Sequence, residues 1–382
     1  MDQKKRFVFL IVIFLFTTTL CFSKAEAVSL SARNAILIEQ ESGRILFEKD
    51  AYTPQRIASI TKIMTAIIAI ESGKLDEKVK ITSDAVHVEG SSIYLKEGDV
   101  LPLRDLVYGL MLRSGNDAAI AIADYVGGSV DGFVYMMNQK AEEIGMEHTV
   151  FSNPHGLDDS EEHYSTAYDM ALLTRYAMNN ETFKEIFATK TYRPSHSDGV
   201  VWKNKNKLLT GLYKYSTGGK TGYTKKARRT LVSTAAKNGM DLIAVTLHAP
   251  DDWNDHIAMF ENAFASYEMK KLVGKGKYRH IKNDFYRGKL VIKQPVYYPL
   301  ANDEEDDLSS SLVLYRPPKH DEWEKEGIPT PVGKLRIFLN GDPIQDIPLF
   351  FEGNPVNDGE DERFLNKIRD LFFAINGIDP DD

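Results

Sequence analysis

Three short strings of residues, set in one order along the chain, supply the residue types that acyl transfer through a serine requires. They are Ser59-Ile60-Thr61-Lys62, Ser114-Gly115-Asn116 and Lys220-Thr221-Gly222. In this order they provide a nucleophile, a base, a proton relay and a lysine that binds a carboxylate. Each string is common by itself. Their combination predicts a serine acyl enzyme.

Ser59 and Lys62 are the expected catalytic nucleophile and base. Residues three apart on a helix share a face, and the apolar run from Ile60 to Ile70 indicates a buried central helix with Ser59 in its first turn. Lys62 accepts the serine proton only when it is neutral, and both burial and a second ammonium group, at Lys220, would lower its pKa. A helix N-cap serine and a lysine stem packed along the surface are the structural alternative.

The second string lies at a loop-to-helix junction, because it precedes the helical segment 117–121. Alone, such a string is typical of a turn and a cap. Together with the other two strings, Ser114 is expected to be the third catalytic residue, which carries the proton between Ser59 and the leaving amine. Asn116 is expected to hold a substrate amide.

The third string is expected on a strand that faces the substrate. Lys220 and Thr221 would bind a substrate carboxylate, and Gly222, which has no Cβ, would let the backbone approach the substrate closely. The backbone amides of Tyr223 and Ser59 would then form an oxyanion hole. The predicted substrate-binding residues are therefore Asn116, Lys220, Thr221, Gly222 and Tyr223.

The charge of the chain is acidic in total and unevenly distributed. The 382 residues carry a formal net charge of −8, which makes the protein a poor candidate for nucleic-acid binding. From Gly199 through Met240, however, there is no acidic residue, and many residues are basic. Such a segment would steer an anionic substrate toward the third string, and a solvated basic face is the alternative.

The first 27 residues have the pattern of a secretory signal peptide. Three basic residues at 4–6 precede an apolar run from Phe7 to Phe16, and Ala25-Glu26-Ala27 is a small-x-small cleavage site. The run is about half as long as a membrane-spanning helix, and an uncleaved anchor is the alternative. The one cysteine of the chain, Cys21, lies in this segment, so we expect an exported, extracytoplasmic protein without disulfides.

The hydropathy pattern after residue 27 predicts an α+β fold followed by a second domain. Strand-like runs lie on both sides of a largely helical region between residues 55 and 187: 35–38, 45–48, 231–235 and 242–247. An antiparallel sheet covered by helices is therefore expected for residues 28–274, with a tight hairpin turn at Asn238-Gly239. From 275 to 358, short strand-like runs alternate with turns, which predicts a small all-β domain.

Residues 359–382 form the last expected segment, an amphipathic helix with an acidic tail. Between Glu360 and Asn376, five apolar residues fall on one helical face: Phe364, Ile368, Leu371, Phe372 and Ile375. Such a helix can lie on a membrane surface, and we expect this contact. Packing of the same face on the β domain is the alternative.

The three strings and their order resemble those of low-molecular-mass penicillin-binding proteins, which are serine-type D-alanyl-D-alanine carboxypeptidases. The resemblance spans roughly residues 30–270 and includes 153–158 (Asn-Pro-His-Gly-Leu-Asp) and 165–170 (Ser-Thr-Ala-Tyr-Asp-Met). It implies a transpeptidase-like domain, a C-terminal β-sandwich and a terminal membrane helix. It also implies removal of the terminal D-alanine from peptidoglycan stem peptides of the cell wall or spore cortex, with β-lactams as inhibitors.

Two positions depart from the family pattern. Arg228 and His248 stand where the family usually has glycine. The resemblance also implies a further arginine that binds the substrate carboxylate, for which Arg228 and Arg229 are the candidates. His155 is expected to stabilise a loop or to lie beside the substrate. We expect no metal and no cofactor, because the histidines lack zinc-ligand spacing.

Two other functions stay open on the sequence alone. A class A β-lactamase adds a glutamate in a Glu-x-x-Leu-Asn string, and this chain has that string only at 362–366, after the third motif rather than before it. The second rival is a penicillin-sensing or wall-binding module that uses the fold without turnover. Rapid cephalosporin hydrolysis would favour the first rival, and binding without product release would favour the second.

Overall fold

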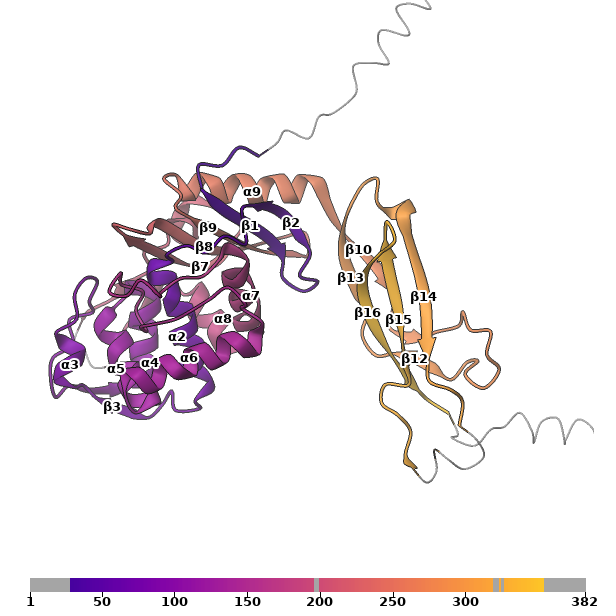
Figure 1. The fold of residues 1–382 in the computed structure, drawn as a ribbon, viewed down its shortest axis with the longest axis horizontal. Helices are drawn as coiled ribbons and strands as arrows, with labels where there is room; N and C mark the ends of the chain where they lie inside the picture. The colour runs from indigo at the N-terminus through magenta and orange to yellow at the C-terminus, as the bar shows by residue number, and fades with distance from the viewer. Residues whose placement is uncertain (1–27, 196–198, 319–322, 324–325, 354–382) are drawn as a thin grey trace, which may run out of the picture.

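The computed structural model describes residues 28–195, 199–318, 323 and 326–353. The expected signal segment (1–27) and the expected C-terminal amphipathic segment (359–382) lie outside the described residues. The described chain forms a domain of helices and sheet, followed by a smaller all-β domain that the chain reaches through α9 (Asp252–Ser266) (Figure 1). The predicted fold class, α+β with a C-terminal all-β domain, is confirmed.

The first domain is built on a five-stranded antiparallel sheet of order β2-β1-β9-β8-β7. Its strands are β1 (Asn34–Glu39), β2 (Ile45–Lys49), β7 (Ser216–Thr224), β8 (Arg228–Lys237) and β9 (Met240–Leu247). Strands from both ends of the domain therefore meet in one sheet, as the sequence predicts. The predicted hairpin turn between β8 and β9 is confirmed, because Asn238 and Gly239 both have positive φ angles.

Helices cover both faces of this sheet. Neighbouring side chains of β1 point to opposite faces of the sheet. Leu37 packs with Phe260 of α9 on one face, and Ile36 packs with residues of α2 (Lys62–Glu71) on the other. In Figure 1, α9 lies on one side of the sheet and the other helices lie on the opposite side. They are α3 (Ser83–Val86), α4 (Leu103–Tyr108), α5 (Asn116–Gly127), α6 (Val130–Ile144), α7 (Ala167–Ala177) and α8 (Glu181–Ala188).

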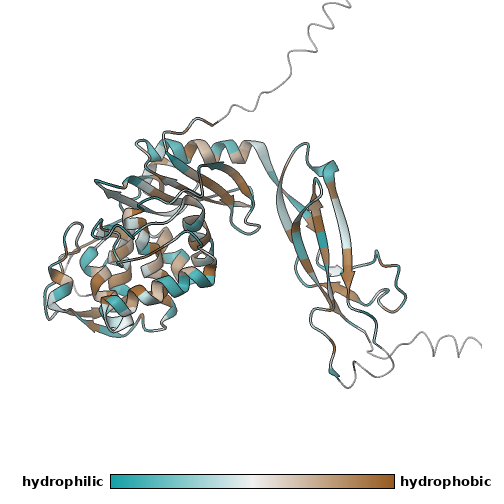
Figure 2. Ribbon diagram, viewed as in Figure 1, coloured by the Kyte–Doolittle hydropathy of each residue, from teal (hydrophilic) through white to brown (hydrophobic). Residues whose placement is uncertain are grey.

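The central helix α2 organises the larger core. All its residues except Glu71 are buried, as the apolar run in the sequence predicts, and the first domain is largely apolar along its central elements (Figure 2). Three short helical turns and two small strand pairs complete the domain: η1 (Ala58–Thr61), η2 (Gly109–Arg113), η3 (Leu208–Leu212), β3 (Lys78–Lys80) with β4 (Val100–Pro102), and β5 (Thr191–Tyr192) with β6 (Trp202–Lys203).

The second domain contains a five-stranded sheet of order β11-β12-β16-β15-β14 and a separate strand pair, β10 with β13. The elements are β10 (Tyr267–Val273), β11 (Gly276–Lys277), β12 (Leu290–Ile292), β13 (Val296–Ala301), η4 (Glu305–Asp307), β14 (Leu308–Leu314), β15 (Gly333–Leu339) and β16 (Asp342–Phe351). Because β10 pairs with β13, we propose that the second domain starts with β10 rather than at residue 275.

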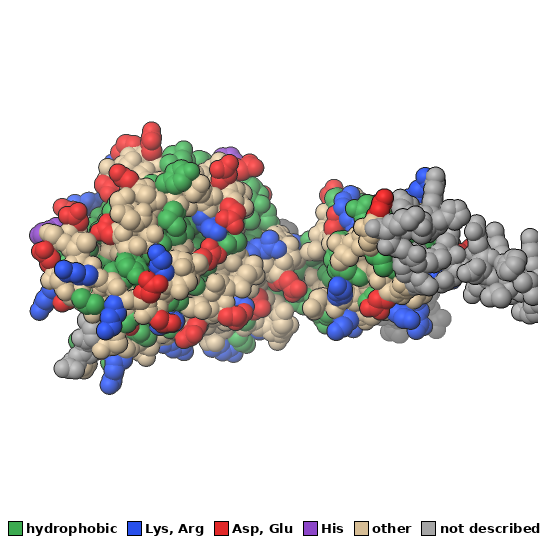
Figure 3. All heavy atoms as spheres, turned by 90° about the horizontal axis from the view of Figure 1, so that it is seen from below, with side chains coloured by type: hydrophobic (Ala, Val, Ile, Leu, Met, Phe, Trp, Pro, Cys, Tyr) green, Lys and Arg blue, Asp and Glu red, His purple; other side chains and the backbone are tan. Residues whose placement is uncertain are grey.

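Arg44, in the turn between β1 and β2, connects the two domains. Its guanidinium donates to the backbone oxygen of Pro299, at 2.5 Å, and to the carboxylate of Glu304. It also lies over the rings of Tyr267 and Tyr298. Elsewhere on the surface, acidic and basic side chains are interspersed over both domains (Figure 3).

Candidate active site

Ser59 lies in the 3-10 turn η1, immediately before α2. The sequence predicts Ser59 in the first turn of the helix, whereas the structure has it in the 3-10 turn that precedes the helix. Ala58, just before the serine, has a φ of 49°, in the left-handed region, so a regular helix cannot extend back through this residue. The loop at Gly156 packs directly on this turn, and a Cβ on Gly156 would lie 1.9 Å from the backbone oxygen of Ala58.

Lys62 opens α2 and points its ammonium at Ser59. Its Nζ is 3.0 Å from Ser59 Oγ and also donates to Asn116 Oδ1, at 2.7 Å, and to the backbone oxygen of His155, at 2.6 Å. The side chain is completely buried. Burial, followed by repulsion from Lys220 and Lys205, lowers the pKa of Lys62 well below its ordinary value. The structure thus brings the predicted nucleophile and base together.

Ser114 and Lys220 form a second serine–lysine pair in the same site. Lys220 Nζ lies 2.9 Å from Ser114 Oγ and is buried, and burial together with nearby Lys205 lowers its pKa to about 7. Ser114 ends η2 in the left-handed region, with a φ of 64°, and α5 begins two residues later at Asn116. The predicted loop-to-helix junction is confirmed.

The third string lies on the edge strand β7, against the turn that carries Ser59. An added Cβ on Gly222 would lie 2.9 Å from the backbone nitrogen of Ser59 and 2.4 Å from Thr230 Oγ1. Thr230 in turn donates to the backbone oxygen of Ile57, which ties β8 to the same turn. Only a glycine at 222 lets β7 come this close to the turn that carries Ser59. The next residue on the strand, Tyr223, is 61% exposed.

A cleft of about 380 Å³ opens over these groups. Of the predicted site residues, Ser59, Ser114, Thr221, Gly222 and Tyr223 line it, whereas Lys62, Asn116 and Lys220 lie buried beneath. The sequence prediction missed several lining residues: Ser91, Lys205, Lys207, Asp252 and Trp253. The only sequence signal for the two lysines is that they belong to the segment without acidic residues.

Arg229, rather than Arg228, lines the cleft. Its Nε donates to Asp252 Oδ1 at 3.0 Å, and its guanidinium lies 5.4 Å from the ring centroid of Trp253. Arg228 is exposed and has a φ of 61°, and His248 has a φ of 51°. At both positions the backbone is therefore left-handed. Glycine adopts this conformation more readily than other residues, which explains why the family usually has glycine there.

His155 stabilises the loop beside Lys62. Its Nδ1 accepts a hydrogen bond from the backbone nitrogen of Leu157, and burial lowers its pKa to about 3, so the ring is neutral. Its contact with the lysine runs through the backbone oxygen, and the ring bonds neither Ser59 nor Lys62 in the described structure. Of the two roles expected from the sequence, stabilising a loop or lying beside the substrate, this arrangement supports the first.

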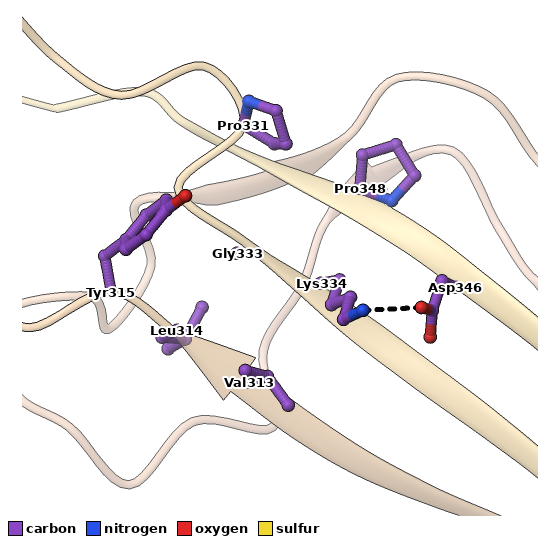
Figure 4. Close-up of a pocket in the computed structure, with 8 residues that line it drawn as sticks. All are labelled: Val313, Leu314, Tyr315, Pro331, Gly333, Lys334, Asp346 and Pro348. Carbon is purple, nitrogen blue, oxygen red and sulfur yellow. Dashed lines mark hydrogen bonds and ion pairs between the residues drawn. The ribbon is translucent and has the colours of Figure 1, made fainter. Parts of the chain in front are cut away.

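A second hollow, of about 460 Å³, lies in the C-terminal domain at the ends of β14, β15 and β16 (Figure 4). Its charged residues, Lys334 and Asp346, pair with each other at 2.6 Å, and the other labelled residues are glycine, tyrosine and aliphatic side chains. It contains no nucleophile paired with a base. Among the described residues, no group of three acidic, histidine or cysteine side chains is arranged to hold a metal ion.

Comparison with known proteins agrees with this geometry. Residues 22–251 match the peptidase S11 family model, described as D-alanyl-D-alanine carboxypeptidase, and residues 267–354 match the model of the penicillin-binding protein 5 C-terminal domain. The D-alanyl-D-alanine carboxypeptidase DacF of Bacillus subtilis is 34% identical over 340 residues, which cover 83% of this chain and 84% of that protein.

Two solved structures show the same architecture. Penicillin-binding protein 5 from Haemophilus influenzae superposes with a TM-score of 0.71 at 25% identity, covering 85% of this chain and 98% of that one. A D-alanyl-D-alanine carboxypeptidase from Mycobacterium tuberculosis H37Rv has a TM-score of 0.60 at 32% identity, covering 63% of this chain and 95% of that one.

The fold and the paired serine and lysine side chains define a penicillin-binding protein of the serine peptidase type. The chain belongs to the peptidase S11 family of D-alanyl-D-alanine carboxypeptidases. The predicted family and enzyme class are confirmed. A class A β-lactamase is disfavoured, because no carboxylate bonds Ser59 or Lys62 in the described structure. The Glu-x-x-Leu-Asn string at 362–366 lies outside the described residues.

Proposed function

We propose that Ser59 attacks the carbonyl of the penultimate D-alanine of a peptidoglycan stem peptide, while Lys62 takes the serine proton. The 3.0 Å contact between Lys62 Nζ and Ser59 Oγ carries this proposal. A lysine is a base only in its neutral form, and the lowered pKa of Lys62 increases the fraction of the side chain in that form. The backbone amides of Ser59 and Tyr223 would stabilise the oxyanion that forms.

The second serine–lysine pair serves the leaving group. Ser114 donates a proton to the departing D-alanine amine as the carbonyl–nitrogen bond breaks, and Lys220, whose Nζ lies 2.9 Å away, reprotonates the hydroxyl. The proton that Lys62 took from Ser59 replaces the one that Lys220 gave up, so Lys62 is neutral again for the second step. Water then attacks the ester on Ser59, with Lys62 as the base, and releases the shortened peptide. Asn116, held by Lys62 beneath the cleft, is suited to hold a substrate amide.

The terminal carboxylate of the substrate binds along β7 and β8, where Thr221 and Arg229 line the cleft. Lys220, Thr221 and Arg229 are the groups of suitable charge and hydrogen-bonding capacity there. Asp252 orients the Arg229 guanidinium by accepting from Nε and Nη2. The side chain is 40% exposed, so its other hydrogen-bond donors can reach a ligand in the cleft. β-Lactams carry a carboxylate and a reactive amide in a similar arrangement, so they are expected to acylate the same serine.

The experiment that tests this function measures D-alanine release from a peptide that ends in D-Ala-D-Ala. Wild-type protein should release one D-alanine per peptide, and Ser59→Ala should lose the activity. Ser114→Ala should keep slow acylation by penicillin while losing most peptide turnover. Undiminished D-alanine release by the Ser59→Ala protein would contradict the proposal.

We also propose that the protein works outside the cytoplasmic membrane, on cell-wall or spore-cortex peptidoglycan. The signal pattern of residues 1–27 supports export, and the apolar face at 364–375 supports attachment to the membrane surface. None of the helices in the described ranges has the length and apolar character that a membrane crossing requires. We expect the mature protein to begin at residue 28. We also expect it to float with lipid vesicles, and to lose this property when residues 359–382 are removed.

A further inference from the structure

A groove of about 680 Å³ lies next to the catalytic cleft, and it is distinct from the hollow in the C-terminal domain. It is formed by the loop after α3, by Arg113 at the end of η2, and by residues 200–203, the last two of which are β6. Tyr94, Val200 and Val201 give it an apolar surface, and these three side chains are between 42% and 86% exposed. The reaction described above makes no use of this groove.

The groove and the cleft share one wall. Three chain segments each place one residue in the cleft and a near neighbour in the groove: Ser91 with Ser92, Ser114 with Arg113, and Lys205 with Lys203. Hydrogen bonds join the segments, because Lys205 Nζ donates to Ser91 Oγ at 3.0 Å and Arg113 donates to the backbone oxygen of Lys203 at 3.2 Å. A peptide that extends from Ser59 across this wall therefore enters the groove.

The charge of the groove is positive. Lys96, Arg113 and Lys203 line it, against a single acid, Asp99. The carboxylate of Asp99 already accepts a hydrogen bond from the backbone nitrogen of Lys96, at 2.9 Å. Three cations around an apolar floor attract a ligand that combines carboxylates with small apolar side chains.

Tyr94 is held in position by the same helix that carries Asn116. The carboxylate of Asp117 accepts hydrogen bonds from the backbone nitrogens of Ile93 and Leu95, and Ser92 Oγ accepts one from Tyr94 nitrogen. Tyr94 is thereby kept at a φ of 65°, a rare conformation for an aromatic residue, with its side chain 86% exposed. An exposed aromatic side chain on a backbone that is fixed in this way is suited to contact a ligand.

We infer that this groove binds the acidic part of the peptide substrate that precedes the D-Ala-D-Ala end, and so determines which peptides are processed efficiently. The inference rests on the proposed function, because the reacting end of the peptide must lie over Ser59 for its upstream part to cross the wall. Arg113 and Lys96 would contact a free carboxylate of the peptide, and Tyr94 would pack on its apolar side chains.

The test uses two synthetic peptides of equal length that end in D-Ala-D-Ala. One carries an upstream γ-linked glutamate with a free carboxylate, and the other carries the corresponding carboxamide. Wild-type kcat/KM should be about tenfold higher for the acidic peptide, and added salt should reduce the ratio. Arg113→Gln and Lys96→Gln should each lower kcat/KM for the acidic peptide alone. Lys80→Gln, which removes an exposed charge on β3, should leave the ratio unchanged.

The two readouts separate the groove from the chemistry. Release of D-alanine from the carboxamide peptide, abolished in Ser59→Ala, reports on the proposed function, whereas the ratio of the two kcat/KM values reports on the groove. Acylation by benzylpenicillin should proceed at the wild-type rate in Lys96→Gln, which shows an intact cleft. Equal kcat/KM values for the two peptides in the wild type, or an equal loss for both in Arg113→Gln and Lys96→Gln, would overturn the inference.

Discussion

At the scale of single residues, the site depends on three lysines gathered around two serines. Lys62 bonds Ser59, Lys220 bonds Ser114, and Lys205 is close enough to lower the pKa of both other lysines. Because each ammonium repels the others, the cluster favours loss of a proton from the most buried lysine. Repulsion between the ammonium groups therefore helps to make a buried lysine available as a base.

Replacing Lys205 should change the pH dependence of the reaction. Lys205→Met removes one of the repelling charges, so the pKa of Lys62 rises and the acid limb of kcat/KM moves to higher pH. A charge interaction on the order of 1 kcal/mol corresponds to a loss of about fivefold on that limb. Lys205→Arg keeps the charge and should restore the wild-type profile. A uniform loss at every pH would instead indicate that Lys205 only fixes the loop at Ser91.

The sequence predicts the residues of the three strings but not those around them. Ser59 and Lys62 are three apart on one helical segment, so their contact follows from local geometry. Lys205 and Asp252 reach the cleft through the folding of distant segments, and no spacing in the sequence relates them to Ser59. For the same reason, only the structure distinguishes Arg229, in the cleft, from the exposed Arg228.

At the scale of elements, the site is the meeting of strand β7 with turn η1. Gly222 permits the approach from the strand, and Gly156 packs its loop on the opposite part of the turn. The hairpin strands follow from short strand-like runs around the Asn238-Gly239 turn, and the buried helix α2 follows from an unbroken apolar run. The close packing of β7 on η1 involves residues far apart in the sequence, as Gly222 and Ser59 illustrate, and no local pattern encodes it.

Gly222→Ala tests this packing. The added methyl group would lie 2.9 Å from the backbone nitrogen of Ser59 and 2.4 Å from Thr230 Oγ1, so the strand or the turn must move. Displacing one donor of an oxyanion hole costs about 100- to 1000-fold in rate, and we expect a loss of acylation rate in that range. Gly274→Ala is the matched control, because a Cβ there meets no atom within 4 Å. Equal acylation rates in the two variants would contradict the account.

At the scale of the whole molecule, three neutral histidines are buried in the first domain. Burial lowers the pKa of His155 to about 3, of His163 to about 4 and of His256 to about 3. In the unfolded chain these groups have pKa values of about 6.5, so between pH 4 and 6.5 the unfolded state binds more protons. The free energy of unfolding should therefore fall as the pH falls through this window.

Urea denaturation between pH 4.5 and 7.5 measures this dependence. Each histidine contributes a slope of at most about 1.4 kcal/mol per pH unit. His256, on α9, is buried between the hydroxyls of Ser233 and Thr246, and His256→Gln removes one titrating group. The variant should show a smaller slope than the wild type, whatever its absolute stability. An unchanged slope would show that His256 is not a neutral buried group.

The central claim is that Ser59 forms the acyl-enzyme, and mass spectrometry of the benzylpenicillin adduct tests it most directly. The intact protein should gain the mass of one penicillin, and after proteolysis the added mass should lie on the peptide that contains Ser59. Ser59→Ala should gain no mass, and Ser114→Ala should gain it slowly. An adduct on any other residue, or a labelled Ser59→Ala protein, would contradict the assignment of Ser59 and Lys62 as nucleophile and base.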